Sequence, residues 1–160
     1  MKIKIYTDGC CLSNGSENAR GGWAFVFPGK KKIKSKSGFV ADTTNNRMEL
    51  LSVIKALKFL SGGKNLLIQR GYDSIQIYSD SAYVVNAVNL DWLVKWGQNG
   101  WKTVNGKDIK NADLWKELVK YCNELDFFKI TFQKVKGHSG NHFNELCDEL
   151  AKKAAQGGGQ

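Results

Sequence analysis

The chain contains few of the residues that mark domain boundaries, covalent crosslinks or membrane segments. Its 160 residues include one proline, Pro28, and four cysteines. The cysteines form no C-x-x-C pair and no histidine is spaced for zinc, so we expect free thiols rather than a disulfide framework or a zinc site. No apolar run is long enough to cross a membrane. The first residues lead directly into a strand-like segment without the pattern of a signal peptide, so a cytoplasmic location is expected.

The composition is that of a globular domain with an excess of positive charge. Hydrophobic residues make up 42% of the chain and charged residues 24%, which is ordinary for a folded domain. The 24 Lys and Arg against 15 Asp and Glu give a net charge of +9. Such an excess favours polyanionic partners, although many basic domains bind no polyanion. We expect one domain over residues 1–156 and a flexible Gly-rich tail at 157–160.

Two segments of the chain are nearly the same, residues 5–9 (IYTDG) and 77–81 (IYSDS). Each has an apolar residue, a hydroxyl residue, an acid and then a turn-forming residue, which is typical of a strand that ends at its Asp. If the two strands are parallel neighbours, they lie about 4.8 Å apart and Asp8 lies beside Asp80. Adjacent carboxylates repel each other unless a positive charge lies between them, and a divalent metal ion usually supplies it.

The pattern along the chain predicts an α/β fold. In chain order we expect three strands, a helix, a strand, three helices, a strand and a last helix, at 2–10, 22–27, 31–40, 46–60, 75–79, 80–88, 92–96, 111–123, 128–135 and 143–156. The first helix is long enough for the crossover that parallel strands need. The expected architecture is a five-stranded mixed sheet, three antiparallel strands followed by two parallel strands, flanked by helices.

Two further acids fall on helix faces that point toward the sheet. Glu49 shares its face with Val53 and Ala56, so this charged residue lies on the apolar stripe. Alone, a first-turn Glu is more often a cap or a complement to the helix dipole. Asp148 falls at the edge of the apolar stripe of the last helix, where a single acid is usually solvated. Taken with the two strand-end acids, however, they indicate a four-carboxylate site.

Seven motifs follow one another across nearly the whole chain: YTDG at 6–9, TTNNRMEL at 43–50, SDSAYV at 79–84, GWKT at 100–103, KNADLW at 110–115, VKGH at 135–138 and CDELA at 147–151. Together they closely resemble type 1 ribonuclease H, the bacterial ribonuclease HI branch. The resemblance implies a ribonuclease H-like fold and hydrolysis of the RNA strand of RNA/DNA hybrids, leaving 3′-hydroxyl and 5′-phosphate ends. It also implies two Mg²⁺ ions, for which Mn²⁺ can substitute. We expect a monomer without an obligate protein partner.

The resemblance assigns catalytic roles to five residues. Asp8 is expected to bridge both ions, Glu49 and Asp80 to complete one metal site, and Asp148 the other. His138 lies between glycines in a loop and is expected to act in proton transfer or product release. The second histidine of the chain reads as a surface residue.

Three asparagines match family positions that contact the hybrid beside the metal ions, where 2′-hydroxyl groups are sensed: Asn14, Asn45 and Asn46. Thr44 and Asn111 match a pocket for a DNA phosphate. Asp42 departs from the family there, because relatives often carry a basic residue and its charge opposes a phosphate. Local backbone hydrogen bonding is the simpler explanation for asparagines at turns and helix starts.

A segment that interleaves aromatic residues with lysines resembles the basic protrusion that cradles the DNA strand in this family. Its members are Trp92, Lys95, Trp96, Trp101 and Lys102. The tryptophans also suit simple packing of a small helical handle. The sequence at 97–99 is less basic than in bacterial relatives, which predicts a weaker grip.

Two segments have no place in this scheme. The lysine-rich run at 30–36 reads as protection of a sheet edge rather than as a binding site. The insertion at 62–73 is longer than in close bacterial relatives and has no functional account.

Two other functions remain open from the sequence. A DNA nuclease of the same fold, such as an integrase or junction resolvase, shares clustered acids but lacks the NNRME block at 45–49. A non-catalytic hybrid-binding module would keep the surface and lose the acids, whereas all four are present.

Overall fold

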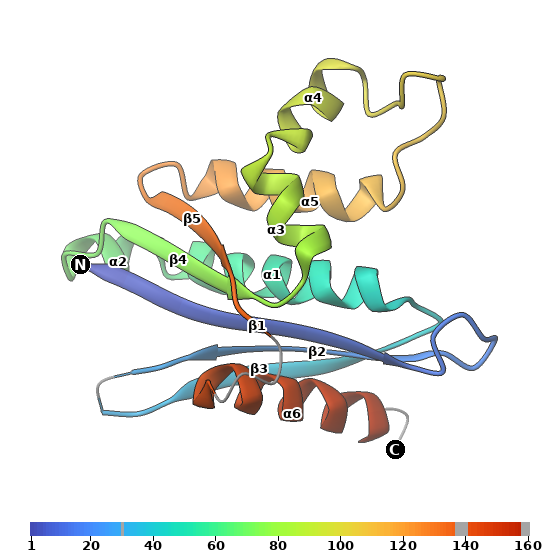
Figure 1. Cartoon of the computed structure of the whole chain (residues 1–160). Coiled ribbons are helices and arrows are strands. Elements are labelled where there is room, and N and C mark those ends of the chain that lie inside the picture. The colour runs from blue at the N-terminus through green and yellow to red at the C-terminus, as the bar shows by residue number, and fades with distance from the viewer. Residues whose placement is uncertain (30, 137–140, 158–160) are drawn as a thin grey trace.

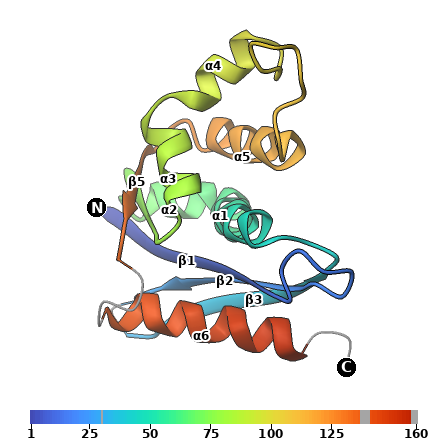
Figure 2. The same cartoon turned by 45° about the vertical axis from the view of Figure 1, so that its right-hand side comes forward.

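Five strands form one mixed sheet with helices on both of its faces (Figures 1 and 2). The computed structural model describes residues 1–29, 31–136 and 141–157. In chain order the elements are β1 (Lys2–Leu12), β2 (Arg20–Phe27), β3 (Lys34–Ala41), α1 (Asn45–Gly62), α2 (Lys64–Gln69), β4 (Ser74–Ser79), α3 (Ala82–Asn89), α4 (Trp92–Gln98), α5 (Ala112–Glu124), β5 (Lys129–Lys134) and α6 (His142–Gly157).

The strand order is β3-β2-β1-β4-β5, which places β1 at the centre of the sheet. β1 is antiparallel to β2, and β2 is antiparallel to β3, whereas β4 is parallel to both β1 and β5. The expected architecture of three antiparallel strands followed by two parallel ones is confirmed. Helix α1 makes the crossover between β3 and β4, as the parallel pairing of β1 with β4 requires.

Two apolar layers hold the sheet between its helices. On one face, Ile5 and Ile77 pack in the cluster that includes Leu57 of α1 and Trp115 of α5, and all four are fully buried. On the other face, α6 lies along β1, β2 and β3 (Figure 2). Burial of apolar surface on this scale is the main source of fold stability. It holds in place the parts of β1 and β4 next to which the acids lie.

Helices α1 and α6 each approach the backbone of the sheet closely at a glycine. A Cβ atom on Gly9 of β1 would overlap the backbone of Met48 and Glu49 in α1, and one on Gly22 of β2 would overlap the backbone of Ala151 in α6. Only glycine leaves room for such an approach. Both contacts lie beside residues expected in the site.

The structure differs from the sequence expectations mainly in two segments. The insertion at 62–73 contains a six-residue helix, α2, which was not predicted from the sequence. Two glycines come directly before it, and glycines usually mark the end of a helix. Strand β3 begins at Lys34 rather than at Lys31, so only the end of the lysine-rich run lies in the sheet. β3 is an edge strand, as expected.

The four cysteines are free thiols, as expected from their spacing. No helix in the described part of the chain is both long and apolar enough to span a bilayer.

Candidate active site

The neighbouring strands β1 and β4 bring two acids together: Asp8 lies within β1, and Asp80 directly follows β4. The parallel register pairs Ile5 with Ile77 and Tyr6 with Tyr78. Asp8 and Asp80 each come two residues after that last pair, so they lie at the same level of the two neighbouring strands. The expected side-by-side placement of the two acids is confirmed. The expectation that both strands end at their Asp holds only for β4, because β1 continues past Asp8 to Leu12 and stays paired with β2.

Glu49 reaches the same point from the first turns of α1. The helix begins after Thr44, whose hydroxyl oxygen accepts a hydrogen bond from the Arg47 N–H at 3.2 Å, as is usual for an N-cap. Gly9 lets the helix approach β1, and its N–H donates to Asp8 Oδ1 and to Glu49 Oε1, both at 3.0 Å. The side chain of Glu49 is buried against the sheet, as its place on the apolar stripe predicts.

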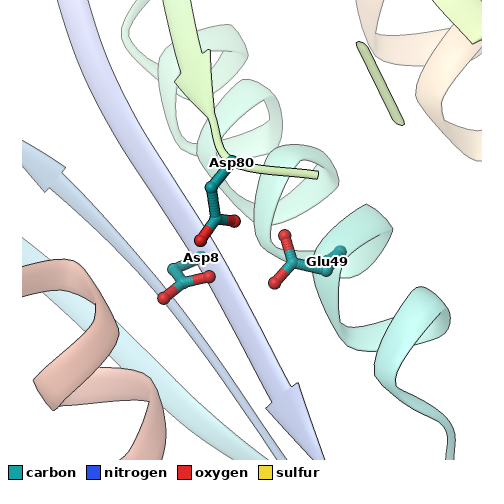
Figure 3. A group of neighbouring side chains, drawn as sticks. All are labelled: Asp8, Glu49 and Asp80. Carbon is teal, nitrogen blue, oxygen red and sulfur yellow. The ribbon is translucent and has the colours of Figure 1, made fainter. Parts of the chain in front are cut away.

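Asp8, Glu49 and Asp80 form a tight carboxylate cluster (Figure 3). Each offers a carboxylate oxygen, and these oxygens lie within 4.8 Å of one another. Burial, and then the charge of Glu49, raises the pKa of Asp8 to about 11, and burial raises the pKa of Glu49 to about 8. Without a cation, the folded protein thus retains protons on acids that would ordinarily be ionised.

The cluster fits a divalent metal ion. Asp8 Oδ2 and Glu49 Oε2 are buried and have no hydrogen-bond partner within the described residues. Buried polar atoms are normally satisfied, so two unsatisfied oxygens on neighbouring acids indicate a missing positive partner. All the donors are carboxylate oxygens, the ligands that hard cations such as Mg²⁺ prefer.

Asp148 lies at the same depression in the surface but is bound differently. It projects from α6 and lines a polar pocket of about 420 Å³ together with the three clustered acids. Its Oδ2 forms an ion pair with Lys152 Nζ at 2.9 Å, and Lys152 lies one helical turn further along α6. The structure therefore brings all four expected acids to one pocket, with the fourth held by a lysine.

The two histidines have different outcomes. His138 lies outside the described residues, so its place relative to the acids stays a prediction. His142 is exposed at the start of α6, which confirms its interpretation as a surface residue.

The three asparagines expected near the RNA strand lie at the rim of the acidic pocket or beside it. Asn45 and Asn46 line the pocket itself. Asn14 is tied to them, because its Oδ1 accepts a hydrogen bond from the Asn45 N–H at 3.2 Å. All three are exposed, so their side chains are open to a bound molecule.

Thr44 and Asn111 both bond to Arg47, a residue that sequence reasoning did not select: the backbone N–H of Arg47 donates to Thr44, and its side chain donates to Asn111. Arg47 Nη1 donates to Asn111 Oδ1 at 3.2 Å, and its two terminal nitrogens donate to both carboxylate oxygens of Asp113, at 3.0 and 2.8 Å. Asn111 Nδ2 in turn donates to the Tyr83 hydroxyl at 3.0 Å. Both polar groups of the Asn111 side chain are thus fixed by partners from other elements.

These partners are far apart in the sequence, which is why sequence reasoning missed them. Arg47 and Tyr83 both lie inside the quoted family motifs, so the motifs contained them without indicating their contacts. Asn111 also has a positive φ of 61°, a conformation that Asn tolerates better than most residues. An asparagine directly before a helix is therefore only a weak sequence signal of a residue with positive φ.

The handle formed by α4 and the loop after it stands away from the sheet (Figure 1). Its tryptophans pack on each other: the ring centroids of Trp92 and Trp101 lie 6.1 and 6.3 Å from that of Trp96, and Trp96 also packs on Trp115 at 5.6 Å. The packing interpretation of these tryptophans is confirmed. They anchor the handle to α5 whether or not they also contact nucleic acid.

The two lysines of the handle are exposed at its surface. Lys95 and Lys102 line an open groove. Lys102 forms an ion pair with Asp108, a partner that no motif in the sequence indicates. The positive charge available to a phosphate from this lysine is therefore reduced.

Known proteins resemble this chain over nearly all of its length. The sequence model of RNase H matches residues 1–156. A Ribonuclease H of Chlorobaculum parvum is 44% identical over 95% of this chain and 94% of its own length. A Ribonuclease H of Acetivibrio thermocellus is 45% identical over 94% of this chain and 92% of its own.

Solved structures agree with the fold. LC9-RNase H1, described as a type 1 RNase H with the type 2 active-site motif, superposes with a TM-score of 0.75 at 33% identity, covering 98% of this chain and 72% of that one. LC11-RNase H1 in complex with an RNA/DNA hybrid gives a TM-score of 0.70 at 21% identity, covering 96% of each chain. The match over residues 1–156 and the identity to curated relatives show that the chain belongs to the RNase H family.

Proposed function

We propose that this ribonuclease H hydrolyses the RNA strand of RNA/DNA hybrids at the pocket formed by Asp8, Glu49, Asp80 and Asp148, with two Mg²⁺ ions as cofactor. Enzymes of the family depend on metal ions, and Mn²⁺ is expected to replace Mg²⁺. The products are RNA ends with a 3′-hydroxyl and a 5′-phosphate. The proposed catalytic unit is residues 1–156, acting as a monomer in the cytoplasm.

The observation that carries the proposal is the pair of unsatisfied carboxylate oxygens, Asp8 Oδ2 and Glu49 Oε2, inside a buried acidic cluster. A structural role for these acids would require hydrogen-bond donors to each oxygen. The described residues supply only the Gly9 N–H, which contacts the other oxygen of each acid. The site is therefore built to receive cations.

When bound, divalent ions would supply positive charge for a phosphodiester transition state and lower the pKa of a nearby water. The protein's contribution is to hold the ligands in place. The Gly9 N–H fixes the orientation of Asp8 and Glu49, and the parallel pairing of β1 with β4 fixes the distance between the strands. Such preorganisation removes the cost of arranging the carboxylates during the reaction.

Hybrid binding is proposed for the polar rim and the handle. Asn45 and Asn46 line the acidic pocket and Asn14 is bonded to Asn45, so their side chains are proposed to sense 2′-hydroxyl groups of the RNA strand. The solved structure of LC11-RNase H1 contains an RNA/DNA hybrid, and the fold it shares with this chain supports the same class of substrate. His138 keeps its proposed role in proton transfer or product release.

The DNA strand is proposed to contact Thr44, Asn111 and the handle. The hydrogen bonds of Asn111 with Arg47 and Tyr83 orient its amide, which would present it in one position to a phosphate. The handle adds Trp101 and two lysines, Lys95 and Lys102, with the grip of Lys102 limited by its ion pair.

The proposal is tested by incubating the protein with Mg²⁺ and end-labelled RNA/DNA hybrid, beside DNA/DNA, RNA/RNA and single-stranded RNA. Only the RNA strand of the hybrid should be cut. Asp80→Asn should abolish hydrolysis while hybrid binding persists, because the substitution removes a metal ligand and leaves the groove intact. Cutting of the DNA strand would assign the chain to DNA nucleases, and binding without cutting would make it a hybrid-binding module.

A further inference from the structure

The two segments without a role in hybrid cleavage meet in space. The C-terminal half of α1, helix α2 of the insertion and the edge of the sheet at β2 and β3 enclose a groove of about 670 Å³. Strand β3 contributes the end of the lysine-rich run, and α2 contributes the insertion. Both segments lie toward the same end of the sheet (Figure 1), and both line this groove.

The floor of the groove is apolar. It consists of Trp23, Phe25, Phe59, Leu60, Leu66 and Leu67. Phe59 keeps 40% of its surface exposed and Leu66 keeps 49%. Large apolar side chains that gather in an open groove are typical of a binding surface rather than of a folded core.

The sides of the groove are cationic. They consist of Lys34, Lys36, Lys55, Lys58 and Arg70, and no acid is among the residues that line the groove. Among the described residues none of these five forms an ion pair, whereas the nearby Lys64 pairs with Asp126. Five cations around an apolar floor make a surface complementary to an acidic ligand that carries a bulky apolar group.

We propose that this groove binds an acidic peptide segment of a partner protein, with one bulky apolar side chain of the peptide on the floor and its carboxylates on the surrounding cations. The volume suits one or two side chains. The apolar contact provides affinity, and the cations provide selection and attraction at long range. This inference goes beyond hybrid cleavage and does not depend on it.

A nucleic acid strand fits the groove less well. Bases bind by stacking on open aromatic faces, but lysines cover two of the rings here. Lys55 Nζ lies 5.4 Å from the centroid of the Trp23 ring, and Lys36 Nζ lies 4.7 Å from that of Phe59. Phe25 is 1% exposed. The groove therefore offers ring edges and aliphatic carbon to an apolar side chain, and few faces to a base.

A second copy of the chain is also disfavoured as the occupant, because two molecules of charge +9 repel each other. The groove is separate from the acidic pocket. Phe59 lies ten residues after Glu49 on α1, a helical distance of about 15 Å. A bound peptide would tether the enzyme to its partner and leave the acids open to the hybrid.

The test uses the full chain and fluorescein-labelled synthetic peptides in which a single Phe lies between runs of Asp and Glu. We expect binding with a Kd on the order of 10–100 μM that weakens as salt rises. Replacing the peptide's Phe by Ser, or its acids by Lys, should abolish binding. Equal binding of the Ser peptide would show charge attraction alone and overturn the proposal.

Two groove variants and one matched control locate the site. Leu66→Asp and Lys58→Glu should each weaken peptide binding at least about tenfold, whereas Lys120→Glu on α5, with the same change in charge as Lys58→Glu, should not. Leu66, Lys58 and Lys120 lie outside the acidic pocket, so all three variants should cleave hybrid at the wild-type rate, which also shows that they fold. Equal losses in the groove and control variants would contradict a defined site.

Backbone amide NMR shifts on peptide addition give an independent readout. They should concentrate in α2, β3 and the end of α1. A single-stranded oligonucleotide serves as the competing ligand. If it produces the same shifts and displaces the peptide, the groove is a nucleic-acid surface and the peptide proposal fails.

Discussion

Gly9 lies so close to Glu49 that its N–H donates directly to the Glu49 carboxylate at 3.0 Å, across the junction of the central strand and the first helix. The same N–H contacts Asp8. One glycine therefore sets the approach of α1 to the sheet and the orientation of two acids. A defect at this position should change the site before it changes the rest of the fold.

Gly9→Ala should impair both activity and stability. The new Cβ would overlap the backbone of Met48 and Glu49, and neither can move without shifting α1. We expect hybrid cleavage to fall at least about tenfold and the free energy of unfolding to fall by about 1–3 kcal/mol, as is usual for overpacking. Cleavage rates and urea unfolding measure the two effects.

Gly62→Ala is the matched control, because nothing lies within 4 Å of the added atom at the end of α1. It should leave cleavage unchanged and should not lower stability. A Gly9→Ala protein as active as wild type would show that α1 can move away from β1 while the Glu49 carboxylate keeps its position.

How far the site could be predicted depended on how local each relationship is. Asp8 and Asp80 occupy matching positions in two similar segments, and Glu49 falls on an apolar helix stripe, so the pattern along the chain indicated the three when they were taken together. The contact of Gly9 with α1 is tertiary and leaves no periodic signal. The bonds of Arg47 with Asn111 and Asp113 join residues more than sixty positions apart, and only folding brings them together.

The elements themselves show the same limit. The long helices and the buried strands were predicted within a few residues, because their periodicity extends over several turns or pairs. Helix α2 has only six residues and follows two glycines, so its apolar residues look like part of a loop. The pair Asp148–Lys152 lies at the i, i+4 spacing that favours ion pairs. The spacing alone allows this ion pair to be predicted, but Asp148 was interpreted as a metal ligand or a solvated acid, and Lys152 was not considered as its partner.

Asp8→Asn should stabilise the protein without metal, and increasingly so as pH rises. The folded-state pKa of Asp8, about 11, is above its ordinary 3.8, so between these values the folded state binds a proton that the unfolded state has lost. Stability from this group is complete at low pH and falls as pH rises, by at most about 1.4 kcal/mol per pH unit. Glu49, with a pKa of about 8, acts in the same direction up to that pH.

The measurement is urea unfolding of wild type and Asp8→Asn in EDTA at intervals from pH 5 to pH 8. The difference in the free energy of unfolding should grow with pH in favour of the variant. Taking the difference between the two proteins cancels the contribution of acids elsewhere. Added Mg²⁺ should stabilise wild type more than the variant. A difference independent of pH would mean that the Asp8 carboxylate is ionised in the metal-free fold.

Asp108→Asn should tighten binding of the hybrid, because it releases Lys102 from its ion pair. We expect several-fold higher affinity, and a dependence on salt steeper by up to about one unit of logarithmic slope. Lys102→Ala should change both in the opposite direction. The double variant should match Lys102→Ala, and an equal gain from Asp108→Asn in both backgrounds would instead assign the effect to net charge.

Lys152→Met should lower the metal concentration needed for half-maximal cleavage. In the structure Lys152 Nζ holds Asp148 Oδ2 at 2.9 Å, so a metal ion that uses Asp148 must first displace an ammonium group. Without that competitor we expect the half-saturating Mg²⁺ concentration to fall several-fold, while the maximal rate changes little. Lys153→Met is the matched control, since Lys153 is its exposed neighbour, lines a different groove and carries the same charge. A shift of equal size in both variants would reflect the field of the protein, whereas no shift in either would show that Asp148 does not take part in metal binding.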